Sequence, residues 1–186
     1  MNLQENINRI HQMMGLLNED VEKTEQLFSD FLGDDKSLWN VYKDIAKELN
    51  DTFTVEHFLL ENKYSGGLKF LAGGILPQTQ TAYDKLNKSV GGGLGINSGF
   101  RNYKKQGEIF LEWAKKLGGT ISDGQKLAAL PGFSEHHTGR ALDISGYDKV
   151  NETILKNHGF VRNYLKPIDN FRLAEPWHIY YRGDLK

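Results

Sequence analysis

The chain has 186 residues, a hydrophobic fraction of 39% and a formal net charge of −1 at pH 7. This length is sufficient for one domain with a full hydrophobic core, and the composition is that of an ordinary globular protein. Cysteine is absent, which excludes disulfides, thiolate metal sites and cysteine nucleophiles. Any metal ligands must therefore be His, Asp or Glu side chains.

Charge is unevenly distributed along the chain. Residues 1–60 carry 5 Lys and Arg against 12 Asp and Glu, whereas residues 61–186 carry 18 against 12. We therefore expect an acidic helical N-terminal segment, 1–60, and a domain, 61–186, whose positive balance suits a polyanion such as nucleic acid or the bacterial cell wall. Two ordinary solvated faces would explain the same asymmetry.

The N-terminal sequence, MNLQENINRIHQMM, has no basic patch followed by an apolar run. No stretch of the sequence is apolar for long enough to cross a bilayer. We therefore expect a chain that is made in the cytoplasm without a Sec signal and that has no membrane span.

The N-terminal segment is predicted to be helical, because apolar residues recur at helical spacing from Ile7 to Leu17 and, more strongly, from Leu38 to Leu49. The next stretch, YSGGLKFLAGGILP (64–77), is too interrupted by glycine for a long helix. It predicts loops around short strands.

Helices and strands alternate loosely in the rest of the chain. The predicted helices are 79–90, 103–117 and about 148–157, and the predicted strands are 94–98, 140–145 and 177–181. Glycines at 91–93 and 118–119 end the first two helices. This pattern favours a small α+β domain.

The last two predicted strands carry polar side chains with metal-binding chemistry. Side chains alternate along a strand, so Asp143 and His178 each lie on the face opposite to their apolar neighbours. If the two strands are adjacent, His178 can face Asp143. His136 can reach the same cleft, because Gly139 permits a tight reversal of the chain between His136 and Asp143.

Two imidazoles and one carboxylate are a normal ligand set for a catalytic zinc ion, which keeps a further position for water. The water needs a base, and Glu175 stands three residues before His178. Pro176 indicates that the strand begins only after it, so Glu175 can turn back toward the metal. A carboxylate beside a metal-activated water is a hydrolytic arrangement.

These residues resemble the motifs of a known family. The pattern SxHxxGxAxD from Ser134 to Asp143, followed by Glu175-Pro-Trp-His178, resembles the D-alanyl-D-alanine carboxypeptidases of the VanY type. Upstream, SGFRNYKKQ (98–106) and LPGFSEH (130–136) resemble two further segments of that family. The resemblance covers roughly residues 79–183. It implies a small antiparallel sheet flanked by helices, as in lysostaphin-like enzymes and hedgehog domains, with an N-terminal helical extension.

The resemblance also implies a role for each matched residue. Those roles are Zn²⁺ binding by His136, Asp143 and His178, general base catalysis by Glu175, binding of the oxyanion or of the terminal carboxylate by Arg101, and peptide contacts by Ser134, Gln106 and Arg101. His137 matches no ligand position, so we expect it to support the site or to be exposed. His158 is expected to cap a helix C-terminus.

The implied activity is removal of a terminal D-alanine from peptidoglycan stem peptides or their precursors, as a D,D- or L,D-carboxypeptidase. One alternative is an endopeptidase of phage or effector origin that cuts within the stem or the cross-bridge, and the missing Sec signal suits it. Another is a non-catalytic zinc-containing module that binds a partner, although Glu175 has no use there. We expect a monomer, and no nucleic-acid partner, because no aromatic-basic motif accompanies the positive charge.

Overall fold

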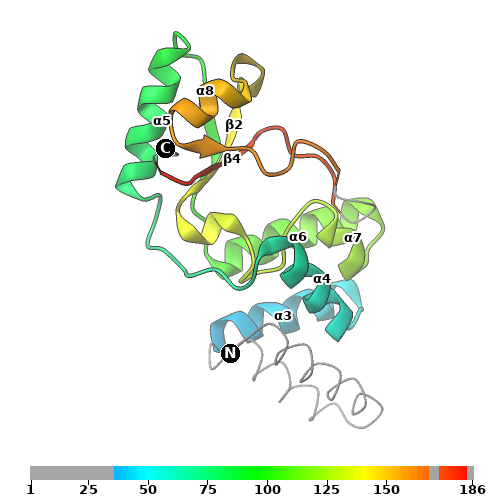
Figure 1. Cartoon of the computed structure of the whole chain (residues 1–186). Helices are drawn as coiled ribbons and strands as arrows, with labels where there is room; N and C mark the ends of the chain where they lie inside the picture. Colours follow the sequence, from blue (N-terminus) through cyan, green and yellow to red (C-terminus); the bar gives the residue numbers. More distant parts are fainter. Residues whose placement is uncertain (1–35, 168–171, 184–186) are drawn as a thin grey trace.

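The computed structural model of the chain describes residues 36–167 and 172–183 (Figure 1). Helices and short strands alternate along it. The elements in chain order are α3 (Lys36–Leu49), α4 (Val55–Ser65), α5 (Pro77–Ser89), β1 (Gly95–Ser98), α6 (Tyr103–Leu117), α7 (Ile121–Gln125), the 3₁₀ turn η1 (Glu135–Thr138), β2 (Ala141–Ser145), the 3₁₀ turn η2 (Tyr147–Lys149), α8 (Glu152–Asn157), β3 (Phe160–Val161) and β4 (His178–Tyr181). Within the described residues, every helix is too short or too polar to cross a membrane.

The four strands form one antiparallel sheet in the order β1-β2-β4-β3. Strands β2 and β4 are adjacent, with Asp143 directly opposite His178. Helices α5 and α8 lie beside the sheet (Figure 1) and share its apolar core. This core contains Leu86, Leu142, Ile144, Leu155, Phe160 and Ile179, each fully buried. The α+β class and the small antiparallel sheet are therefore confirmed.

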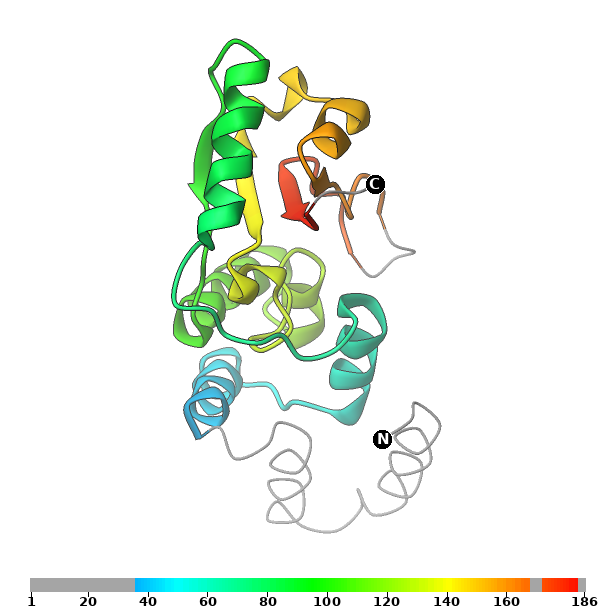
Figure 2. The ribbon, with the colours of Figure 1, turned by 60° about the vertical axis from the view of Figure 1, so that its left-hand side comes forward.

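A second hydrophobic core lies at the other end of the molecule, among α3, α4, α6 and α7 (Figure 2). Helix α3 buries Leu38, Tyr42 and Ile45, which are spaced to share one helical face. It packs closely on α6 because Gly107 has no side chain there; a Cβ at this position would lie 2.6 Å from Val41 Cγ1. The segment before the sheet is thus part of a continuous packed structure.

The described part of the N-terminal segment is helical, as predicted, and α3 has the bounds expected from its apolar spacing. The helix predicted over 7–17 lies outside the described residues. Because α4 runs across position 60 and shares a core with α6 and α7, the division into 1–60 and 61–186 stays a prediction.

Two local predictions are wrong. No strand forms between residues 64 and 77: α4 continues to Ser65, and a loop follows in which Phe70 is 60% exposed instead of covering a sheet. The helix expected over 148–157 is divided into η2 and α8. Asn151 separates the two because its side chain accepts a hydrogen bond from Ile154 N and caps the start of α8.

Candidate active site

The three predicted metal ligands meet at the junction between the two cores. One ligand atom from each of His136, Asp143 and His178 lies within 4.8 Å of the others. The pairing of β2 with β4 places Asp143 beside His178, and the turn η1 brings His136 to the same point. The predicted proximity of Asp143 and His178 is therefore confirmed, and so is the approach of His136. Their binding of a metal stays a prediction.

Residues flanking His136 hold its turn in place. The Ser134 side chain accepts a hydrogen bond from His136 N (3.3 Å) at the start of the turn. At its end Gly139 has φ 66°, and a Cβ there would lie 2.2 Å from the carbonyl oxygen of Gly74. Only glycine allows both this left-handed backbone and this close approach.

Each imidazole has its second nitrogen engaged by an acceptor. His136 Nδ1 lies 2.6 Å from the carbonyl oxygen of Gly99, and His178 Nε2 lies 2.9 Å from Glu135 Oε2. His136 Nε2 and His178 Nδ1 are left facing the Asp143 carboxylate, at 3.3 and 3.0 Å. Metal-binding histidines are held by their second nitrogen in this way. The donor set therefore fits a zinc ion.

The electrostatics of the cluster favour a cation. Burial would raise the pKa of Asp143, but His136 and His178 outweigh it and hold the pKa well below its usual range. Burial lowers the pKa of His136, which leaves this imidazole neutral and able to donate a lone pair. Burial would lower the pKa of His178, but hydrogen bonds to Asp143 and Glu135 outweigh burial and raise this pKa to about 10. These two carboxylates favour a positive charge at His178, whether a proton or a metal ion supplies it.

Arg101 lies beside the cluster. Its Nη2 forms an ion pair with Asp143 Oδ2, while Nε donates to Ser98 Oγ at 2.8 Å and Nη1 to Gln106 Oε1 at 3.3 Å. The guanidinium is thus held in a fixed orientation next to the ligand group. A metal ion bound to Asp143 would share that carboxylate with Arg101.

Glu175 lies in the same pocket, immediately before the Pro-Trp pair that precedes β4. Its backbone N–H donates to the carbonyl oxygen of Tyr164 at 2.7 Å. Burial raises the pKa of the Glu175 carboxyl, against the opposing influence of His178 and Arg172. Strand β4 begins at His178, so Glu175 is free of the strand alternation, as Pro176 predicted.

Six of the seven predicted site residues line this one pocket. The seventh, Asp143, is not in the lining but contacts two of its members, His136 and His178. The six are Arg101, Gln106, Ser134, His136, Glu175 and His178. Two of them also hold the structure: Ser134 caps η1, and Gln106 donates to the carbonyl oxygen of Ala129 at 2.8 Å. Their contact with a peptide stays a prediction.

Two further histidines, His137 and His158, have structural positions. His137 is fully buried, accepts a hydrogen bond from Gly132 N (2.9 Å) and lies 2.7 Å from the carbonyl oxygen of Arg101. The alternative that it is exposed is therefore wrong, and it supports the loop that carries Arg101. His158 caps the C-terminus of α8 through the carbonyl oxygen of Ile154, as expected.

Three polar residues of the pocket were not identified from the sequence: Glu135, Tyr164 and Arg172. Glu135 had a usable signal, because it stands next to His136 and a carboxylate commonly supports a metal-binding imidazole. Tyr164 and Arg172 are placed by tertiary structure alone, and no local spacing marks them.

A buried cluster of two imidazoles and a carboxylate, with a second carboxylate and an arginine in one pocket, defines a metallohydrolase type of site. Residues 77–159 match the family model VanY, D-alanyl-D-alanine carboxypeptidase. Residues 77–159, together with this site, are therefore similar to the VanY-type zinc peptidases of the LAS superfamily. Helices α3 and α4, and also Glu175 and His178, lie outside the matched residues.

Two curated proteins are similar to the chain as well. The chain is 32% identical over 116 residues to a D-alanyl-D-alanine carboxypeptidase of Enterococcus faecium. This alignment covers 54% of this chain and 34% of that protein. It is 31% identical over 121 residues to the putative carboxypeptidase YodJ of Bacillus subtilis (strain 168), covering 56% of this chain and 43% of that protein. The chain thus spans less than half the length of these two relatives.

Solved structures show the same architecture. VanYB in complex with D-alanine-D-alanine has a TM-score of 0.52 and 27% identity, covering 63% of this chain and 77% of that one. A vancomycin resistance D,D-pentapeptidase VanY, solved in complex with Zn(II), has a TM-score of 0.51 and 27% identity, covering 63% and 79%.

Proposed function

We propose that the protein is a zinc-dependent carboxypeptidase that removes a terminal D-alanine from peptidoglycan stem peptides, as a D,D- or an L,D-enzyme. The observation that carries this proposal is the convergence of His136, Asp143 and His178 with Glu175 in one pocket. The D-alanine-D-alanine and Zn(II) complexes of the two VanY structures support it.

In this proposal His136 Nε2, His178 Nδ1 and the Asp143 carboxylate hold the zinc ion. Zinc, when bound, polarises the scissile carbonyl and lowers the pKa of a bound water. Glu175 takes a proton from the attacking water and then delivers it to the leaving amine. Burial raises the pKa of this carboxyl, which makes it a stronger base for the first of these steps.

Arg101 supplies a fixed positive charge beside the metal cluster. A guanidinium that is held by Asp143, Gln106 and Ser98 does not have to reorganise when negative charge develops on the scissile carbonyl oxygen. Its planar arrangement of donors can also bind a carboxylate with two hydrogen bonds.

We also propose that the protein acts as a monomer on peptidoglycan or its precursors. All the site residues described above come from a single chain, so the site does not need a second copy. Light scattering coupled to gel filtration should give the mass of one chain; the mass of a dimer would contradict this part of the proposal.

Mass spectrometry of stem pentapeptide, stem tetrapeptide and intact cross-linked peptidoglycan tests the activity. Each substrate is incubated with the protein, with and without a zinc chelator. We expect loss of one terminal D-alanine from a free stem peptide, and we expect the chelator to abolish it. Fragments released only from cross-linked material would favour an endopeptidase, and the absence of any product would favour a binding module.

A further inference from the structure

Arg101 lies in a short segment without regular structure, between the end of β1 at Ser98 and the start of α6 at Tyr103. The turn η1 holds the backbone of this segment. The Arg101 N–H donates to the carbonyl oxygen of His136 at 3.3 Å, and the Arg101 carbonyl oxygen lies 2.7 Å from Nδ1 of His137. Two consecutive residues of the turn that carries a predicted metal ligand therefore contact both polar groups of the Arg101 backbone.

The hydrogen bonds of His137 define which of its nitrogens carries the hydrogen. A backbone N–H can only donate, so Nε2 of His137 accepts from Gly132 N at 2.9 Å with its lone pair. A carbonyl oxygen can only accept, so Nδ1 carries the hydrogen and donates it to Arg101. Each nitrogen of His137 is thus committed to one backbone group.

The surroundings of His137 fix the position of its imidazole. The residue is fully buried, and the ring of Tyr103 packs against it with centroids 5.0 Å apart and an interplanar angle of 88°. Its backbone N–H donates to the Ser134 carbonyl oxygen at 3.1 Å, and its own carbonyl oxygen accepts from Ala72 N at 2.8 Å. The Nδ1 donor is therefore a fixed point for the Arg101 carbonyl oxygen.

The side chain of Arg101 depends on the placement of this backbone. Its guanidinium bonds to Ser98, Gln106 and Asp143, as described above. A group that stabilises developing charge has to be held close to its productive position, and a misplacement of about 1 Å can cost about a hundredfold in rate. A small shift of the Arg101 backbone is therefore expected to affect catalysis.

We propose that His137 is a positioning residue, which holds Arg101 against the metal cluster through the hydrogen bond from Nδ1 to the Arg101 carbonyl oxygen. The inference rests on the proposed function, because His137 acts through the charge stabilisation assigned there to Arg101. A purely structural His137 would stabilise the fold through either of its hydrogen bonds. A positioning role instead makes the bond to Arg101 matter for turnover and the bond to Gly132 matter only for stability.

Two amide side chains separate these two hydrogen bonds. In His137→Asn the amide nitrogen reaches the position of Nδ1, so the side chain can donate to Arg101 but cannot accept from Gly132. In His137→Gln the amide reaches the position of Nε2, so the side chain can accept from Gly132 but cannot donate to Arg101. Each variant loses one buried hydrogen bond, and each is the matched control for the other.

The first measurement follows hydrogen exchange of the Arg101 side chain by NMR in the zinc-loaded protein. Nε–H of Arg101 donates to Ser98 Oγ at 2.8 Å, and its signal is assigned by its absence from Arg101→Met. His137→Gln should speed this exchange on the order of tenfold, whereas His137→Asn should change it much less. Equal exchange in the two variants would overturn the inference.

The second measurement is kcat/KM for a stem peptide. His137→Gln should lower it on the order of tenfold, and His137→Asn should keep most of the wild-type value. In the Arg101→Met background the two variants should have equal kcat/KM, since no guanidinium remains to be positioned. A difference that persists in that background, or a larger loss in His137→Asn than in His137→Gln, contradicts a positioning role.

Tyr83→Phe is a further control, because it removes a buried hydrogen bond to the carbonyl oxygen of Leu94 (2.9 Å) outside the pocket. It should leave kcat/KM and the Arg101 exchange unchanged. Circular dichroism and zinc content establish that each variant is folded and loaded. If the His137 variants do not fold, proton–nitrogen NMR correlations of the wild-type imidazole decide. Hydrogen on Nδ1 supports the inference, and hydrogen on Nε2 overturns it.

The two measurements also separate the inference from the proposed function. Turnover of stem peptides with equal Arg101 exchange in both His137 variants keeps the proposed function and rejects the inference. Faster exchange in His137→Gln than in His137→Asn, without any turnover by the wild type, keeps the positioning of Arg101 and rejects the proposed activity.

Discussion

Glu135 and His178 are 43 residues apart in the sequence, and their side chains meet with Glu135 Oε2 at 2.9 Å from His178 Nε2. Asn163 donates from Nδ2 to the other oxygen of Glu135 at 2.8 Å, which fixes the carboxylate. This contact leaves His178 Nδ1 as the nitrogen that faces Asp143. Glu135, which is not one of the three predicted ligands, thus helps to fix the ring orientation of His178.

Replacing Glu135 should therefore weaken metal binding. Glu135→Gln keeps the size of the side chain but removes its negative charge, and we expect the affinity for zinc to fall by about 10- to 100-fold. Competition with a zinc indicator measures this. Glu112→Gln, an exposed change on α6 in a surface ion pair with Lys116, should leave the affinity unchanged. Equal affinities for the Glu135→Gln and wild-type proteins would show that the contact does not support the ligand.

Gly139→Ala should destabilise the turn that carries His136. The new Cβ meets the carbonyl oxygen of Gly74 at 2.2 Å, in addition to the cost of φ 66°. We expect the free energy of unfolding to decrease by at least about 2 kcal/mol. Gly119→Ala is the control, because it has φ 89° with nothing within 4 Å of its Cβ and pays only the backbone cost. Denaturant unfolding that gave the same loss for both variants would contradict the account.

The buried pair of Glu61 and Arg172 predicts strong coupling in stability. Glu61→Ala removes the carboxylate from a buried guanidinium, and we expect a loss of about 3–5 kcal/mol. The double variant Glu61→Met with Arg172→Met should recover a large part of this loss, since no buried charge remains. Urea unfolding of the single and double variants forms a thermodynamic cycle. Strictly additive losses would show that the two charges do not interact.

His57 predicts a component of the pH dependence of stability. Its Nδ1 accepts a hydrogen bond from Thr54 N (3.0 Å) at the start of α4. Burial lowers the pKa of His57, although Asp51 and Glu56 oppose this. The unfolded chain binds the proton at about pH 6.5, and the folded chain binds it only at lower pH. The stability that neutral His57 contributes is therefore complete above about pH 6.5 and decreases as the pH falls below it.

His57→Gln separates titration from capping, because glutamine at this position of a capping box can also accept from Thr54 N. At pH 8 we expect the free energies of unfolding of variant and wild type to agree within about 1 kcal/mol. Between about pH 6.5 and pH 5 the wild type should lose more stability than the variant. Parallel curves from denaturant unfolding at a series of pH values would show that His57 does not contribute.

Much of the metal cluster could be predicted because it depends on local rules. Alternation along a strand assigned the faces of Asp143 and His178, and a glycine at position 139 marked the reversal that returns His136. The relationship between Arg172 and Glu61 follows no such rule. It spans 111 positions and depends on how α4 packs against the chain that precedes β4, which no local spacing encodes.

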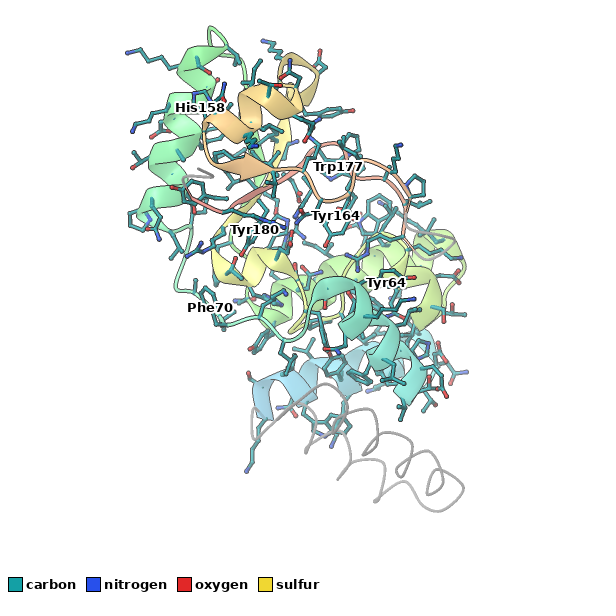
Figure 3. The ribbon with its side chains drawn as sticks, in the orientation of Figure 1. Tyr64, Phe70, His158, Tyr164, Trp177 and Tyr180 are labelled. Atoms are coloured by element: carbon teal, nitrogen blue, oxygen red, sulfur yellow. The ribbon has the colours of Figure 1, made fainter. Side chains whose placement is uncertain are left out.

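The fold, too, could be predicted where local patterns determine it and could not where tertiary contacts do. Helix α6 was predicted with its bounds from its apolar spacing and from the glycines at 118 and 119. In the structure Asn102 caps its start and Gly118 its end. The stretch 64–77 was assigned short strands on its apolar composition, yet Leu68, Phe70 and Leu71 are exposed by 44%, 60% and 45%. Phe70 is seen at the edge of the molecule, pointing outward (Figure 3). Composition gives the apolar content of a short segment, whereas tertiary contacts decide whether that segment joins a sheet.

The central claim is that His136, Asp143 and His178 hold zinc while Glu175 performs the proton transfer. The most direct test measures zinc content and stem-peptide turnover in the same preparation of the Glu175→Gln protein. We predict that zinc is retained at the wild-type stoichiometry and that turnover falls by about 10²- to 10⁴-fold. Loss of zinc in this variant, or turnover at the wild-type rate, would contradict the claim.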